Sequence, residues 1–274
     1  MAAEPLISKT SPLNFERYEL KYLIPETMIQ PICRYIERFC VSDPHADDTG
    51  SYWINTLYLD SDDYRLFRRR ENDEDRRFTM RMRSYGDQPK PPYFVEIKYK
   101  QDGVVKKYRH PINDEMLHQF CNDPSLPPFH ELSEFPSKNL AMFARLGTTY
   151  NVSPKIQTRY RRIAYMSILD SYARVTFDLN LQYHEERDYH LSPNLRAMTH
   201  YDNPLHFPNG CNVILELKCD TQVPLWMIDL IRTFDLRRSG FSKYCSSLAE
   251  MMGPVPVSSR RRATPFRTGP FAGF

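Results

Sequence analysis

Charged side chains alternate with apolar ones in several short segments of the sequence, and this pattern is the one that could support chemistry. The charged members are Arg81 and Arg83 in 79–85, Glu96, Lys98 and Lys100 in 93–100, Arg174 and Asp178 in 173–181, and Glu216 and Lys218 in 212–219. Glu19 and Lys21, and likewise Tyr160 and Arg162, are also two positions apart. Because side chains at i and i+2 share one face of a strand, each segment would separate its charges from its apolar side chains.

An antiparallel sheet with one solvated face gives this alternation routinely. Two features favour an enclosed face instead. The polar positions hold charges rather than Ser, Thr or Gln, and they mix many long bases with a few carboxylates. Inside a closed sheet, such a face is costly in free energy unless it holds a compensating ion or ligand.

The sign of the charge excess indicates what that ligand would be. Bases outnumber acids on these faces: Lys21, Arg81, Arg83, Lys98, Lys100, Arg162, Arg174 and Lys218 stand against Glu19, Glu96, Asp178 and Glu216. Guanidinium groups match phosphate oxygens, and Mg²⁺ or Mn²⁺ binds carboxylate oxygens alongside substrate phosphates. We therefore expect a polyanion, accompanied by a divalent cation on the carboxylates.

A further anion site is suggested by the tetrapeptide Phe241-Ser-Lys-Tyr, which stands where a helix is expected to begin. A helix N-terminus with a serine cap and an adjacent lysine can bind an anion. A plain N-cap beside a surface lysine explains Ser242 and Lys243 equally well.

Two other clusters have structural interpretations. The histidines between residues 183 and 210 have spacings unlike those of zinc sites, so we expect surface residues at His184, His190, His200 and His206. Asp60, Asp62 and Asp63 could bind a cation, but acids are favoured at a helix start.

The elements that must position these residues form an α+β pattern. Strands are predicted at 15–24, 52–60, 79–85, 93–100, 104–110, 155–167, 172–182 and 212–219, and helices after Pro25, in 113–150, at 224–236 and at 242–252. We expect a flexible lead at 1–13, an insertion loop at 183–210, and a disordered Pro/Arg tail at 253–274.

Composition excludes several classes of protein. The 274 residues contain 37 Lys and Arg against 34 Asp and Glu, and four of the arginines lie in the acid-free tail, so the rest is nearly neutral and nucleic-acid binding is not expected. The six cysteines form no Cys-x-x-Cys motif, which favours reduced thiols in the cytoplasm. We find no transmembrane-length apolar run and no glycine-rich nucleotide motif.

Nine short motifs occur in an order that resembles the VTC domain of polyphosphate polymerases, within the CYTH or triphosphate tunnel metalloenzyme superfamily. They are Glu-Leu-Lys-Tyr (19–22), Tyr-Leu-Asp (58–60), Arg-Met-Arg-Ser-Tyr-Gly (81–86), Phe-Val-Glu-Ile-Lys-Tyr-Lys (94–100), Lys-Tyr-Arg (107–109), Tyr-Arg-Arg-Ile-Ala-Tyr (160–165), Arg-Val-Thr-Phe-Asp (174–178), Glu-Leu-Lys (216–218) and Phe-Ser-Lys-Tyr (241–244). The resemblance implies a single domain at 14–252, a closed antiparallel β-strand tunnel with helices packed outside.

The resemblance also implies roles for the tunnel residues. The expected catalytic bases are Arg81, Arg83, Lys98, Arg162 and Arg174, the expected substrate-binding residues are Lys21, Lys100, Lys107, Arg109, Tyr160, Lys218, Ser242 and Lys243, and the metal ligand is Glu216, with Glu19, Glu96 and Asp178 as further candidates. The superfamily's Glu-x-Glu-x-Lys signature is incomplete, because Arg17 stands at its first glutamate.

The implied activity is metal-dependent transfer of a phosphoryl group from ATP to polyphosphate, with Mn²⁺ or Mg²⁺ as cofactor and pyrophosphate or polyphosphate as acceptor. A triphosphatase, a non-catalytic polyphosphate or nucleotide sensor, and a solvated sheet without a ligand remain alternatives. A membrane partner and the oligomeric state also stay open.

Overall fold

The computed structural model describes residues 18–101, 104–122, 137–200, 210–220 and 222–252. The predicted lead and tail, together with Arg17 and His206, lie outside these residues. No helix in the described ranges is both long and apolar enough to cross a membrane.

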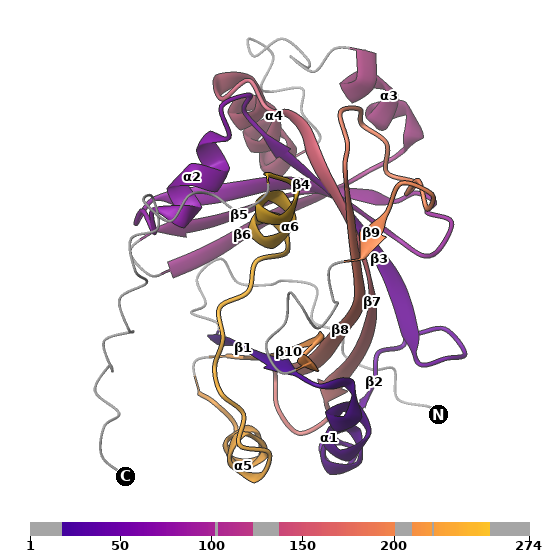
Figure 1. Ribbon diagram of the computed structural model, residues 1–274, viewed down its shortest axis with the longest axis vertical. Helices are drawn as coiled ribbons and strands as arrows, with labels where there is room; N and C mark the ends of the chain where they lie inside the picture. Colours follow the sequence, from indigo (N-terminus) through magenta and orange to yellow (C-terminus); the bar gives the residue numbers. More distant parts are fainter. Residues whose placement is uncertain (1–17, 102–103, 123–136, 201–209, 221, 253–274) are drawn as a thin grey trace, which may run out of the picture.

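The described strands form one antiparallel, ten-stranded sheet in the order β1-β10-β8-β7-β3-β4-β5-β6, with β2 on β7 and β9 on β8 (Figure 1). The strands are β1 (Tyr18–Ile24), β2 (Cys40–Ser42), β3 (Ser51–Asp60), β4 (Arg77–Tyr85), β5 (Tyr93–Gln101), β6 (Val104–Ile112), β7 (Ser153–Ser167), β8 (Ala173–Glu185), β9 (Thr199–His200) and β10 (Val213–Cys219). The expected antiparallel sheet of a tunnel fold is therefore confirmed.

The sheet curls so that its two ends face each other. In Figure 1 the long strands β3, β7 and β8 form the back, while β4–β6 bend over one end and β1 and β10 over the other. Lys98 on β5 reaches across to Glu19 on β1, with Nζ 3.3 Å from Oε2. Among the described residues β1 and β6 are not paired, so side chains rather than backbone hydrogen bonds join the two ends.

The period of two in β8 is interrupted at Asn180, which has a φ of 53°. The pairing of β7 with β8 shifts register between Arg159 and Arg161, as at a β-bulge. Leu181 therefore packs with Tyr160 on the inner face, the face that also carries Arg81 and Glu96. This shift places an apolar cluster of Ile54, Tyr160, Leu181 and Ile214 on the inner face.

Helices cover the outer face in two groups, each over its own core. After a short 3-10 turn (η1, Glu26–Met28), α1 (Ile29–Ile36) packs with α5 (Leu225–Thr233) against β1, β8 and β10. The other core lies under α4 (Lys138–Thr149) and includes α2 (Arg65–Glu71) and α3 (Asp114–Asn122). These contacts are the ones that the apolar strand faces predicted.

Helix α6 (Lys243–Met252) lies on the inner side of the sheet. In Figure 1 it stands between strands β4, β5 and β6 on one side and the pair β1 and β10 on the other. Its Tyr244 and Leu248 pack with Tyr58 and Ile156, which lie on the inner face of β3 and β7. The prediction that the helices pack outside the sheet is therefore wrong for α6, because the inner face of β3 and β7 is itself partly apolar and an amphipathic helix can pack on either face.

The described part of the predicted insertion is ordered. Strand β8 continues to Glu185, and Gln182 pairs with His200 of β9. Leu191 is buried in the outer-face core, so the loop packs against the outside of the sheet.

The outer-face core should dominate the free energy of unfolding. Leu217 of β10 is fully buried beneath α1 and α5, so Leu217→Ala should lower the free energy of unfolding by about 2–5 kcal/mol. Leu225→Ala is the matched control, because that side chain is 79% exposed and its loss should cost less than about 0.5 kcal/mol. Urea denaturation monitored by circular dichroism measures both; equal losses would contradict this description of the core.

Candidate functional site

The inner face gathers the predicted charged residues into two groups on facing walls. We call the first the Glu96 group, which contains Glu96, Arg81, Arg83, Lys107 and Arg109 on β4, β5 and β6. We call the second the Glu216 group, which contains Glu216, Glu19, Asp178, Lys21, Arg162, Lys218 and Lys243 on β1, β10, β8, β7 and α6.

A single carboxylate holds the Glu96 group together. The Glu96 oxygens lie 2.7 Å from Arg81 Nη2, 2.7 Å from Lys107 Nζ, 3.3 Å from Arg109 Nε and 3.8 Å from Arg83 Nη1. Burial alone would raise the pKa of Glu96, but the cations, led by Arg83 and Arg81, hold it well below its usual range. Four bases against one acid leave this wall strongly positive.

Arg109 and Lys107 form the solvent side of this wall. The Arg109 guanidinium lies 3.5 Å from the centre of the Phe94 ring and donates a hydrogen bond to the Tyr85 hydroxyl at 3.0 Å. Its side chain is 37% exposed and that of Lys107 is 44% exposed, whereas Arg83 is almost fully buried. The positive charge therefore extends from the interior to the surface.

Glu216 is the centre of the facing wall. Its carboxylate oxygens lie 2.8 Å from Lys218 Nζ, 3.2 Å from Lys21 Nζ and 3.8 Å from Arg162 Nη2. Lys21 also lies 3.0 Å from Glu19, so two carboxylates converge on one ammonium. Burial opposes ionisation of Glu216, but the surrounding lysines, Lys218 first, hold its pKa well below its usual range.

Asp178 binds two cations from different elements. Arg162 donates two hydrogen bonds to its oxygens at 2.6 and 2.7 Å, and Lys243 Nζ lies 2.5 Å from Oδ2. Lys243 also lies 4.3 Å from the centre of the buried Tyr160 ring. Burial raises the pKa of Asp178, and the opposing charges of Arg162 and Lys243 lower it further than burial raises it.

Ser242 caps the start of α6. Its hydroxyl oxygen accepts a hydrogen bond from the backbone N–H of Cys245 at 3.3 Å, as an N-cap does. Lys243 is not a surface lysine, since its side chain is only 10% exposed. The start of α6 therefore holds both a serine cap, Ser242, and a buried cation, Lys243.

Two lysines on the inner face lose protons unusually easily. Burial, with repulsion from Lys21 and Arg81, lowers the pKa of Lys98 to about 8 although Glu19 and Glu216 oppose the shift. Partial desolvation of Lys107, together with repulsion from Arg83 and Arg81, lowers its pKa to about 7 against the attraction of Glu96. Both groups would gain protons if an anion bound beside them.

Two predicted residues lie at the margins of these groups. Arg174 is opposite Lys218 in the sheet, but its Nη2 is 2.5 Å from Oδ2 of Asp43, a buried residue just after β2. Asp43 was not found from the sequence, because a single acid in a polar loop has no spacing that marks it. Lys100 lies beyond Lys98 on β5, opposite Arg77 and Val105.

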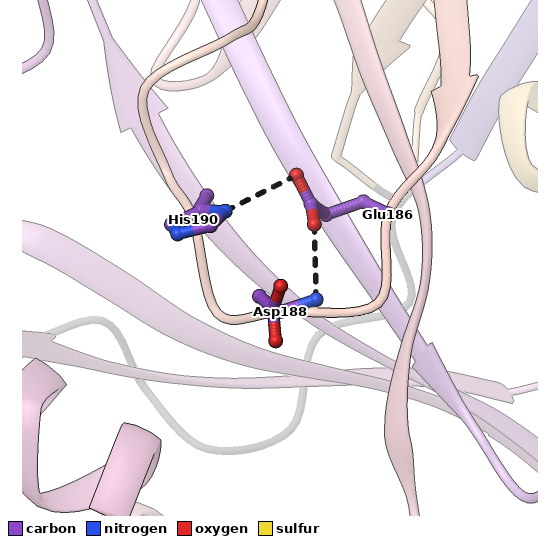
Figure 2. A group of neighbouring side chains, drawn as sticks. All are labelled: Glu186, Asp188 and His190. Carbon is purple, nitrogen blue, oxygen red and sulfur yellow. Dashed lines mark hydrogen bonds and ion pairs between the residues drawn. The ribbon is translucent and has the colours of Figure 1, made fainter.

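A group of potential metal ligands in the described residues lies on the outer face instead. Figure 2 shows Glu186, Asp188 and His190, whose ligand atoms lie within 4.8 Å of one another. Glu186 accepts the backbone N–H of Asp188 at 2.9 Å and lies 3.6 Å from His190 Nδ1, so it orders the turn after β8.

The predicted surface position is confirmed for His190 and wrong for His184. The His190 side chain is 66% exposed. The His184 side chain is only 9% exposed, because its Nε2 bonds to Gln157 on the outer face of β7 at 2.9 Å.

The Glu96 carboxylate should be essential for stability. Glu96→Gln keeps the shape but removes the only acid among four bases, so we expect the free energy of unfolding at pH 7 to fall by about 3–5 kcal/mol. Because the folded-state pKa is depressed, this stabilisation exists above the unfolded pKa of about 4.3 and is lost as pH falls below it. Thermal melts between pH 3 and 7 measure the difference, with the half-exposed Glu74→Gln as control. A difference that is independent of pH would refute the assigned role.

Comparison with known proteins identifies relatives of this chain. It is 28% identical over 233 residues to vacuolar transporter chaperone complex subunit 4 of Trypanosoma brucei brucei, covering 74% of this chain and 29% of that protein. It is 23% identical over 284 residues to the subunit 4 of Trypanosoma cruzi, covering 88% and 35%. The chain thus spans about a third of the length of these curated relatives.

Solved structures resemble it more distantly. A candidate adenylate cyclase of Bacillus halodurans has a TM-score of 0.45 at 11% identity, covering 82% of this chain and 92% of that one. A candidate adenylyl cyclase of Hippeastrum with a dominant triphosphatase activity has a TM-score of 0.47 at 13% identity, covering 88% and 99%. Residues 16–252, nearly all of the described chain, match the model of the VTC domain, and the chain therefore belongs to the VTC domain family.

Proposed function

We propose that the protein is a metal-dependent phosphoryl transferase that uses ATP to elongate inorganic polyphosphate. The observation that supports this most strongly is the Glu96 group, in which one buried carboxylate faces four bases. An enclosed excess of positive charge is costly unless a ligand compensates it. A chain of phosphoryl groups compensates it along its whole length.

The bases on both walls would hold the triphosphate of ATP. Arg81 and Arg83 reach it from one wall, and Arg162 and Lys243 reach it from the other. Guanidinium forks bind phosphate oxygens in pairs and stabilise the charge that develops during transfer. The transfer itself needs positioning and neutralisation of charge rather than a covalent nucleophile from the protein.

The donor set of the second wall fits a divalent cation. Glu216 and Glu19 would hold Mn²⁺ or Mg²⁺, since their oxygens already converge on one cation, the ammonium of Lys21. A cation bound there supplies neutralisation of the phosphate oxygens. Glu96 is better assigned as a counter-ion than as a ligand, because four bases already surround it.

The acceptor would be the terminal phosphate of pyrophosphate or of a short polyphosphate, which is itself a nucleophile. The apolar cluster of Ile54, Tyr160, Leu181 and Ile214 lies on the same inner face and is fully buried. It excludes water from that part of the interior, and exclusion of water favours transfer to phosphate over hydrolysis.

We also propose a reducing compartment, the cytoplasm, because Cys33, Cys40, Cys219 and Cys245 are free thiols.

Purified protein with ATP, Mn²⁺ and pyrophosphate should yield a ladder of polyphosphate chains on a sizing gel. Arg81→Met should lower kcat/KM by about 10²–10³-fold, because one charged donor to the transferred group is lost. Arg161→Met is the matched control, since Arg161 points to Ser51 and Thr49 away from the inner face and should keep full activity. Free phosphate without chains would identify a triphosphatase, and binding without turnover a sensor.

Binding of inorganic tripolyphosphate should take up protons near pH 8. The free protein has Lys98 with a pKa of about 8 and Lys107 with a pKa of about 7, and a bound anion raises both. Affinity should therefore weaken as pH rises through 7 to 9. Calorimetry in buffers of different ionisation enthalpy measures the uptake. Lys98→Met should reduce it and the exposed Lys106→Met should not; equal uptake in all three proteins would contradict the assignment.

A further inference from the structure

Asp60, at the end of β3, connects two helices through one buried carboxylate. Its Oδ1 accepts the backbone N–H of Leu66 and its Oδ2 that of Phe67, both at 2.9 Å, so it caps α2 as its helix-start position predicted. Oδ2 also accepts the hydroxyl of Tyr244, from the first turn of α6, at 2.7 Å. Asp60 is completely buried, so this bond is not shared with bulk water.

Aromatic rings complete the attachment of α6. The Tyr244 ring stacks on Tyr58 with centroids 5.0 Å apart and meets the edge of Phe67 at 6.2 Å. Tyr244 is 2% exposed, and burial together with Asp60 raises the pKa of its hydroxyl far above the usual value. The hydroxyl therefore remains a donor, and without Asp60 it would be buried and unpaired.

This attachment bears on the site through the adjacent residue. Successive side chains on an α-helix diverge by about 100°, so fixing Tyr244 against Asp60 also fixes the direction of Lys243. Lys243 points into the Glu216 group, with Nζ 2.5 Å from Asp178 and 4.3 Å from the centre of the Tyr160 ring. Sliding or rotating the helix would remove a cation from the wall that faces the Glu96 group.

We infer that Asp60 and Tyr244 are positioning residues for phosphate binding: their hydrogen bond holds α6 inside the curled sheet so that Lys243 reaches the substrate. This inference rests on the proposed function. It gives a structural role to Asp60 of the Tyr-Leu-Asp segment and to Tyr244 of the Phe-Ser-Lys-Tyr segment. Neither of these two residues needs to touch the phosphate for that role.

The test is Tyr244→Phe in the full chain, which removes the hydroxyl and keeps the stacked ring. Tyr64→Phe is the matched control, because Tyr64 lies in the same apolar cluster and its hydroxyl does not bond to Asp60. Hydrogen exchange of the α6 amides, measured without ligand, should rise at least tenfold in Tyr244→Phe and stay unchanged in Tyr64→Phe. Asp60→Asn, which keeps the side-chain size, should act in the same direction as Tyr244→Phe.

Calorimetric titration with inorganic tripolyphosphate then asks whether the effect passes through Lys243. Tyr244→Phe should weaken binding about tenfold in the wild-type background and leave it unchanged in a Lys243→Met background. An equal loss in both backgrounds, or unchanged amide exchange, would overturn the inference. If wild-type protein binds no tripolyphosphate, the proposed function fails and so does a role in phosphate binding, while amide exchange alone then decides whether the bond anchors the helix.

Discussion

The inner face of the curled sheet encloses more positive than negative charge, and the ion pairs of its buried carboxylates make this possible. Glu96 is fully buried and surrounded by four bases. Its carboxylate offsets the repulsion between these cationic side chains on β4 and β6. Desolvation of each of these charges raises the free energy of the folded state, and the attraction between the opposite charges offsets only part of that increase. A fold that maintains such an excess is suited to an anion with many charges, and the facing wall offers the carboxylates that a metal would need.

The two faces of the sheet have different roles. The outer helices α1, α4 and α5 bury the apolar strand faces and contribute most of the stability. Because these apolar cores lie outside the sheet, the inner face can carry an excess of bases, provided that carboxylates such as Glu96 offset part of their repulsion. Helix α6 is different, since it lies on the inner side and contributes Lys243 directly to the Glu216 group.

Much of the candidate site follows from strand geometry. Arg81 and Arg83, Glu96 and Lys98, and Glu216 and Lys218 share the inner face because residues two apart always do so within a regular strand. The bulge at Asn180 shows where that rule stops: a single residue in the left-handed region shifts the register and brings Leu181 inward. Asn180 adopts the left-handed region more readily than its neighbours Leu179 and Leu181 would, but an asparagine within a strand does not by itself predict a bulge.

The sequence by itself determined which side chains lie together on each strand, the serine cap of α6, and the excess of bases over acids, because these properties depend on spacings of a few residues. Only the tertiary structure decided that Arg174 pairs with Asp43, 131 positions away, and that Asp60 bonds to Tyr244, 184 positions away. Such pairs arise when the curled sheet brings distant segments into contact. No periodicity in the chain records that contact, since it depends on the packing of every strand between them.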